Sequence, residues 1–238
     1  MAGVTFGGAT WTTAAGNKTV TLTPAVGDLL FVFCANSGRT TAQPPTVACD
    51  VQGITFSQFT GTNGSYTKNT SADSGWVFIA DSLCTAASST IVTMTASSDT
   101  GGGLVVFRVS GMSRAGIGAI RQCGKQDNIA SGTPSVVMPA AILTGNPVFG
   151  LVNTTTNGSA NSAPPTSWTE DADQGYTSTA NGIEVAHRAS GETLTTIAWT
   201  AVAPSAFGSI IAELDASVPV SPQTVSFGQQ TYRQIVPQ

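Results

Sequence analysis

The segment at residues 27–37 constrains the fold of this chain more than any other. Its apolar run from Leu29 to Cys34 has no polar interruption. A strand with one face in water alternates apolar and polar residues, so an unbroken run indicates a strand that is covered on both faces. The chain must therefore supply layers of structure on two sides of this strand.

The rest of the chain is also typical of β-structure. No window of eleven or more residues has a helical apolar period, and glycine, proline and Asn-Gly punctuation recurs about every ten residues. Further strands are expected at residues 4–6, 19–23, 54–59, 76–80, 90–96, 104–110 and 135–138, and near Ile120. We predict an all-β, two-sheet antiparallel β-sandwich of jelly-roll type, with a closed barrel as the alternative.

The same order of segments occurs twice. Residues 145–153 repeat the pattern of residues 27–35, and one Pro-Pro pair follows each segment, at residues 44–45 and 164–165. Three later strands also have counterparts: 183–188 for 76–80, 195–201 for 90–96, and 207–214 for 104–110. We expect two diverged halves, residues 27–112 and 145–217, that each supply strands to both sheets of one domain spanning residues 1–217.

The tail at residues 218–238 differs in composition from the body. Its prolines disfavour a central strand, yet it is too apolar for a fully solvated linker. We expect an extended arm that docks on its own body or on a partner, with a disordered terminus as the alternative. The docking residues would be Val225, Phe227, Tyr232, Ile235 and Val236.

Charge excludes some partners. Only 9% of the residues are charged, the formal net charge is −4, and the nine Lys and Arg residues are scattered. Nucleic-acid binding requires clustered cations, so no nucleic-acid partner is expected. No run is long enough to span a membrane and the start is unlike a signal peptide, so we expect no membrane partner and synthesis in the cytoplasm.

Two further patterns have structural interpretations. Cys34, Cys49, Cys84 and Cys123 form no Cys-x-x-Cys pair, so buried free thiols are expected and a zinc site is not. The run at residues 101–103 is Gly-Gly-Gly, but no Lys-Ser/Thr follows it, so a flexible turn is expected rather than a phosphate-binding loop.

The only histidine, His187, is the one candidate for a Ser-His-Asp or Cys-His centre. It shares a strand face with Ile183 and Val185, which favours a packed histidine. No Gly-x-Ser-x-Gly sequence supplies a nucleophile. We expect no catalytic residue and no cofactor.

Acidic residues leave two other sites open. Glu170, Asp171 and Asp173 begin like a calcium loop, but the twelfth position is Gly182 instead of glutamate, which excludes an EF-hand. A looser metal site and a solvated acidic turn remain as alternatives, and no metal site is assigned. A glycosidase would need two paired carboxylates, for which the candidates are Asp171, Asp173, Glu184 and Glu192.

The aromatic residues divide into two groups. Trp76 and Trp199 fall in strands and are expected in the core. The residues that would form a sugar-stacking surface are Trp11, Trp168, Tyr66 and Tyr176.

These segments together resemble β-sandwich proteins of tailed bacteriophage particles. The resemblance spans residues 20–216 and rests on Gly-Asp-Leu-Leu at 27, a Pro-rich loop, Trp-Val-Phe-Ile-Ala at 76, Thr-Ile-Val-Thr at 90 and Val-Val-Phe-Arg-Val-Ser-Gly at 105. In that family such domains decorate the capsid or form part of the tail.

The resemblance implies a non-enzymatic virion structural protein. It would be a capsid decoration or cement protein that binds the major capsid protein and its own copies, with a trimer expected by analogy. The alternatives are a tail or baseplate component, a carbohydrate-binding adhesin, and a hydrolase.

Overall fold

A computed structural model describes most of the chain. The described residues are 2–12, 16–37, 43–68, 73–96, 101–154, 163–176, 181–200 and 206–216. Within them the chain forms antiparallel strands, loops and a 3₁₀ turn at Ile117–Ala119. This confirms the all-β prediction, and the sheets do not close into a barrel. The described part has no helix with the length and apolarity that crossing a bilayer requires.

The first half of the chain builds one large and one small sheet. The large sheet has the order β1-β9-β3-β7-β5, with β6 also paired to β7, and the small sheet has the order β2-β8-β4. The strand bounds are β1 Gly3–Thr12, β2 Lys18–Leu22, β3 Leu29–Ser37, β4 Thr46–Cys49, β5 Phe56–Gln58, β6 Ser65–Lys68, β7 Asp73–Ala80, β8 Thr90–Thr95 and β9 Gly101–Ser110.

The second half repeats this pattern. Its large sheet has the order β10-β16-β12-β14-β13, and β11 pairs with β15 in a small sheet that an isolated bridge between Ala163 and Thr200 extends. The bounds are β10 Ile120–Ile129, β11 Ser135–Val137, β12 Val148–Thr154, β13 Thr169–Tyr176, β14 Asn181–Arg188, β15 Thr196–Ala198 and β16 Phe207–Leu214.

Corresponding strands therefore take corresponding places in the two halves. In the second half, β10 takes the place of β1, β12 that of β3, β14 that of β7 and β16 that of β9. Strand β13 covers the positions of both β5 and β6. Apart from the strand at the β5 position, this is the jelly-roll order, with strands one, eight, three and six in one sheet and two, seven and four in the other.

One detail of the predicted topology is wrong. Each half was expected to supply strands to both sheets of a single sandwich, but every sheet takes its strands from one half. The reason is that the strands within residues 3–22 and 120–137 belong to the repeat and pair within their own half, so each half has enough strands to complete its own sheets. The repeat thus begins at β1 and at β10, before residues 27 and 145.

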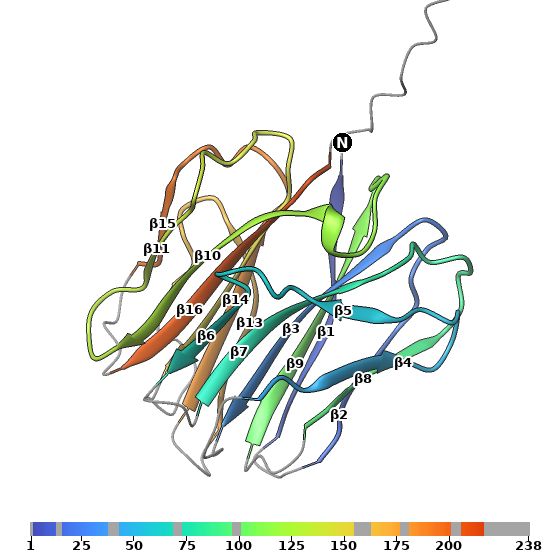
Figure 1. Cartoon of the computed structure of the whole chain (residues 1–238), viewed down its shortest axis with the longest axis horizontal. Coiled ribbons are helices and arrows are strands. Elements are labelled where there is room, and N and C mark those ends of the chain that lie inside the picture. Colours follow the sequence, from blue (N-terminus) through green and yellow to red (C-terminus); the bar gives the residue numbers. More distant parts are fainter. Residues whose placement is uncertain are drawn as a thin grey trace, which may run out of the picture.

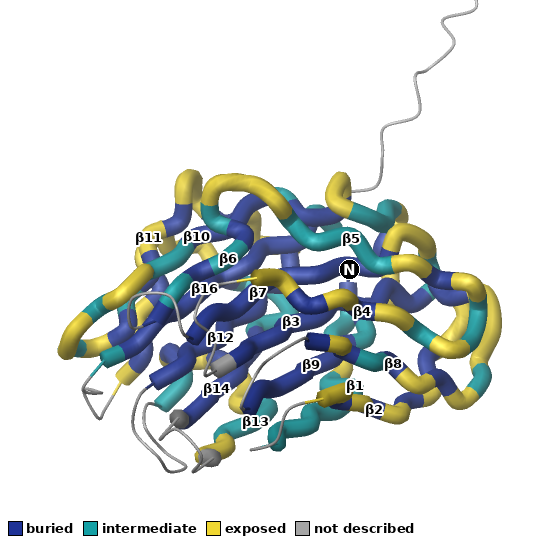
Figure 2. The backbone as a smooth tube through the Cα atoms, turned by 60° about the horizontal axis from the view of Figure 1, so that its bottom comes forward, coloured by how far each residue is buried: buried dark blue, intermediate teal, exposed yellow. Residues whose placement is uncertain are grey.

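The two large sheets pack face to face, and the small sheets cover their outer faces (Figure 1). Phe149 of β12 lies against Phe31 of β3 and Phe107 of β9, with ring centroids 4.5 and 4.9 Å apart. Side chains from Leu29 to Cys34 are at most 1% exposed, which confirms the strand covered on both faces. Figure 2 shows the buried central strands and the exposed loops around them.

The three glycines at residues 101–103 lie in β9, so the predicted flexible turn is wrong. A Cβ on Gly102 would lie 2.4 Å from the carbonyl oxygen of Ala35 on the adjacent strand. The glycine therefore allows close approach of two backbones within the sheet.

The cysteines are free thiols, as predicted. Cys34, Cys84 and Cys123 are buried and Cys49 is half-buried. Burial raises the pKa of Cys84 to about 11, and it raises the pKa of the Cys34 and Cys123 thiols further. These thiols stay protonated and behave as small apolar side chains.

Each half also anchors the turn before its central strand through its last strand. Arg108 lies opposite Leu30 and donates through Nε to Asp28 Oδ2 at 2.8 Å. Glu213 lies opposite Val148, the counterpart of Leu30, and accepts from Asn146 Nδ2 at 2.7 Å. The last strand thus holds the turn through a cation, Arg108, in the first half and through an anion, Glu213, in the second half.

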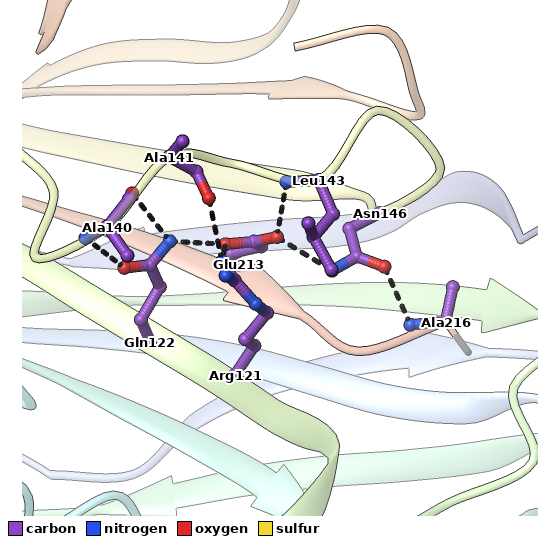
Figure 3. Close-up of polar contacts among 8 residues, drawn as sticks. All are labelled: Arg121, Gln122, Ala140, Ala141, Leu143, Asn146, Glu213 and Ala216. Carbon is purple, nitrogen blue, oxygen red and sulfur yellow. Dashed lines mark hydrogen bonds and ion pairs between the residues drawn. The ribbon is translucent and has the colours of Figure 1, made fainter. Parts of the chain in front are cut away.

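The Glu213 carboxylate is fully buried and saturated with donors (Figure 3). Oε2 accepts from Arg121 Nη1 at 2.6 Å and from Gln122 Nε2 at 2.5 Å, and Oε1 also accepts from the backbone N–H of Leu143 at 2.9 Å. A buried charge of this kind is stable only because every partner is present. We assign this cluster to the fold.

Candidate functional site: an open seam between the two halves

Stacking of the large sheets creates two seams between the halves. At one seam, β6 of the first half contacts β10 and β16 of the second. At the other, β1 of the first half contacts β13 of the second. Because β10 corresponds to β1 and β13 to β5 with β6, the two seams are structurally equivalent. They differ in how they are filled.

The β6–β10 seam is closed by Tyr66. This ring is 1% exposed and lies between Gly75 of β7 and Gly208 of β16. A Cβ on either glycine would lie 2.3 Å from the ring. The backbone N–H of Thr67 donates to Asp127 Oδ1 at 2.9 Å across the same seam. Both halves therefore contribute to a continuous packed core here.

Lys68 adds buried hydrogen bonds and an ion pair to the closed seam. Its side chain is fully buried, and Nζ donates to Asn153 Oδ1 at 3.1 Å and to the Thr154 carbonyl at 2.8 Å, both on β12. Asp73 Oδ2 lies 3.2 Å from Nζ. Burial lowers the pKa of Lys68 to about 8, although the attraction and hydrogen bond of Asp73 act in the opposite direction.

The β1–β13 seam is open. It holds a groove of about 450 Å³, which is within the size range of small-molecule sites. The lining residues come from the two edge strands: Phe6, Ala9, Thr10 and Trp11 from β1, and Asp171, Ala172 and Gln174 from β13.

Trp11 is one of two partly exposed aromatic side chains of this groove, the other being Phe6. It lies opposite Gly103 of β9, where a Cβ would lie 1.6 Å from the indole ring. A side chain at residue 103 would therefore displace the ring. This arrangement leaves part of the indole available to the groove.

Gln174 marks one difference between the two seams. Tyr66 pairs with Gly75 in one half, and Gln174 pairs with Ile183 in the other. The two partners are equivalent because they lie opposite equivalent residues of β3 and β12. An exposed glutamine therefore stands where the closed seam has a buried tyrosine.

Asp171 is held in place by His187. Asp171 is the extra residue of a β-bulge in β13, and its Oδ2 lies 2.7 Å from His187 Nδ1. The histidine is 8% exposed and packs against Phe107 and Phe149, with ring centroids 5.9 and 6.3 Å away. His187 is thus a packed, hydrogen-bonded core residue, as its strand face indicated.

The acidic segment at residues 170–173 is part of strand β13, so both the calcium-loop and the acidic-turn interpretations are wrong. A strand forms because this edge position is covered on one face only, which tolerates polar residues. Among the described residues, no group of three or more His, Cys, Asp or Glu side chains is arranged to hold a metal ion.

The other acidic candidates lie outside the groove lining. Asp173 lies opposite Glu184, which is 2% exposed. Glu192 accepts from the Trp168 indole at 2.9 Å and from Arg188 Nη1 at 3.0 Å. Burial acts to raise the pKa of Glu192, but the Leu194 N–H, the indole and its other donors outweigh it and lower the pKa.

The structure sorts the aromatic candidates. Trp76 and Trp199 are buried, as predicted. Trp168 is also buried, and its ring centroid lies 6.4 Å from that of Trp199. Because Trp168 and Tyr66 are both buried, neither can form an exposed stacking surface. Trp11 alone of the described candidates lines a groove. The side chain of Tyr176 and the proposed arm residues from Val225 to Val236 lie outside the described residues.

Sequence reasoning named Trp11, Asp171 and His187 separately and missed Phe6, Ala9, Thr10 and Gln174. The available signal was the repeat itself, because Gln174 takes the position of Tyr66. Comparison with protein-family models, curated proteins and solved structures gives no match to this chain.

Proposed function

We propose that this chain is a non-enzymatic structural protein of a bacteriophage-type virion, which decorates the capsid and binds both the major capsid protein and its own copies. The proposal rests on the resemblance of its strand succession to such proteins. It is supported by the jelly-roll strand order of each half.

The observation that carries a contact role is the outer face of the β2-β8-β4 sheet. Strict alternation puts Lys18, Val20 and Leu22 inside and leaves Thr19 and Thr21 exposed. The neighbouring strands add exposed Thr46, Ala48, Ile91 and Thr95. The face carries hydroxyl, methyl and aliphatic groups without a charge, and depletion of charge is typical of the centre of a protein interface.

A second feature supports contact between copies. An apolar hollow of about 420 Å³ lies between edge strands β4 and β5 and includes Val47, Ile54, Phe56 and Phe78. The arm at residues 218–238 carries apolar side chains of matching chemistry. We assign the hollow as a docking place for the arm of a neighbouring copy.

Fractionation of virus particles tests the proposal. Particles from cells that produce the protein are banded on a density gradient, and each band is quantified by mass spectrometry. The protein should band with the major capsid protein at a fixed ratio that survives a second gradient. Recovery only in the soluble fractions would refute the virion role.

The arm has its own test. A chain that ends at Ser217 should bind stripped particles more weakly than the full chain, and Phe56→Asp should have the same effect because it puts a charge in the hollow. The matched control Thr196→Ala changes an exposed residue of β15, which lies in neither the β2-β8-β4 face nor the hollow. Equal binding by the full and shortened chains would show that the arm does not attach the protein.

A further inference from the structure

We propose that the groove in the open seam is a binding site for a carbohydrate, which the protein would hold against Trp11. This function goes beyond attachment to a particle and does not depend on it. The assignment comes from three properties of the groove: its aromatic surface, its polar groups and its open shape.

The aromatic surface is rigid. Trp11 lies flat on Gly103, and a side chain at that glycine would collide with the indole at 1.6 Å. Phe6 and Ala9 of the same strand extend the apolar wall. A sugar ring has an apolar C–H face that packs on such a surface, because an indole buries large area at little entropic cost.

The polar groups favour a neutral ligand. The Asp171 side chain is 3% exposed, and its Oδ2 is already engaged by His187. Its charge is therefore directed into the core, which disfavours a cationic ligand. Gln174 is exposed, and its amide both donates and accepts hydrogen bonds. That pairing suits ligand hydroxyl groups, which also donate and accept.

The opening of the groove follows from the comparison of the two seams: Tyr66 lies on Gly208 in the closed seam, and Trp11 lies on the equivalent glycine, Gly103, in the open one. Tyr66 fills the closed seam from the strand position that Gln174 occupies in the open one. Both strands that line the open seam also contain bulges, at Gly7 in β1 and at Asp171 in β13. Bulges redirect side chains and are common beside binding sites. In the open seam an exposed glutamine and a partly exposed Trp11 therefore line a groove where the closed seam has a packed core.

The probe is a glycan array of neutral hexose, N-acetylhexosamine and deoxyhexose oligosaccharides, incubated with the labelled full chain. The strongest glycan is then titrated by calorimetry. The wild-type protein should bind at least one glycan class, and Trp11→Ala should weaken that binding tenfold or more.

Gln174→Tyr provides a second test that retains Trp11. It puts a bulky ring beside Trp11 on the exposed strand position that lines the groove, so it should obstruct the groove and weaken glycan binding tenfold or more, and the melting temperature reports that the variant is folded. The control Phe56→Ala removes a partly exposed aromatic from the other hollow and should bind like wild type. Absence of binding to every glycan, or unchanged binding by both groove variants, would overturn the proposal and leave the virion role untouched.

Discussion

Lys68 makes the stability of this protein depend on pH in an unusual direction. Burial lowers its pKa from 10.5 to about 8. Between these values the unfolded chain binds a proton that the folded protein has released, so the free energy of unfolding rises with pH. At about 1.4 kcal/mol per pH unit, the gain from pH 8 to pH 10.5 is about 3 kcal/mol.

The gain must be measured as a difference between two proteins. Buried thiols keep their protons in the folded state and lose them when unfolded above pH 9, so they lower stability in the same range. Lys68→Met removes the amine and leaves every thiol in place. The thiol contributions then cancel when the variant is subtracted from the wild type.

The assay is urea unfolding followed by tryptophan fluorescence at intervals from pH 7 to pH 10.5. The stability of the wild type relative to Lys68→Met should increase by about 3 kcal/mol over this range. Thr67→Val, on the same strand, adds no titratable group and should give a constant offset. A constant difference for Lys68→Met as well would show that the amine is solvated and that the closed seam is not packed as described.

Three further predictions concern other parts of the fold. In a denaturant titration, Glu213→Ala should lower the free energy of unfolding by about 3–5 kcal/mol, because it leaves buried donors and a cation without their partner. Arg114→Ala, which breaks a partly exposed ion pair, should lower it by less than about 1 kcal/mol. Gly103→Ala should displace Trp11, lower stability by about 1–3 kcal/mol and shift the tryptophan emission to longer wavelength. In a thiol-reagent assay, the half-buried Cys49 should react first in the native protein and all four thiols should react in denaturant; rapid native labelling of all four would contradict the packing.

The sequence predicted the central strands and failed at the edges, for a physical reason. A strand covered on both faces needs the continuous apolar run that Leu29 to Cys34 provides. Edge strands β1, β10 and β13 are covered less and carry glycine or charged residues, and bulges at Gly7 and Asp171 interrupt the alternation. The strand at residues 120–129 was therefore predicted only near Ile120, and residues 170–173 were predicted as a loop.

The groove was harder to predict than the fold. Trp11 and Asp171 lie on strands from different halves, and only the stacking of the two large sheets brings them together. A repeat in sequence does not specify that stacking. It does identify the replacement of Tyr66 by Gln174 once the strand registers are known.

Imaging of particles is the most direct test of the account. Cryo-electron microscopy of virions purified from cells that produce the protein should show, on the particle surface, density for two stacked jelly-roll halves. The uncharged β2-β8-β4 face should lie against a neighbouring protein. Particles identical with and without the protein would contradict the proposed function.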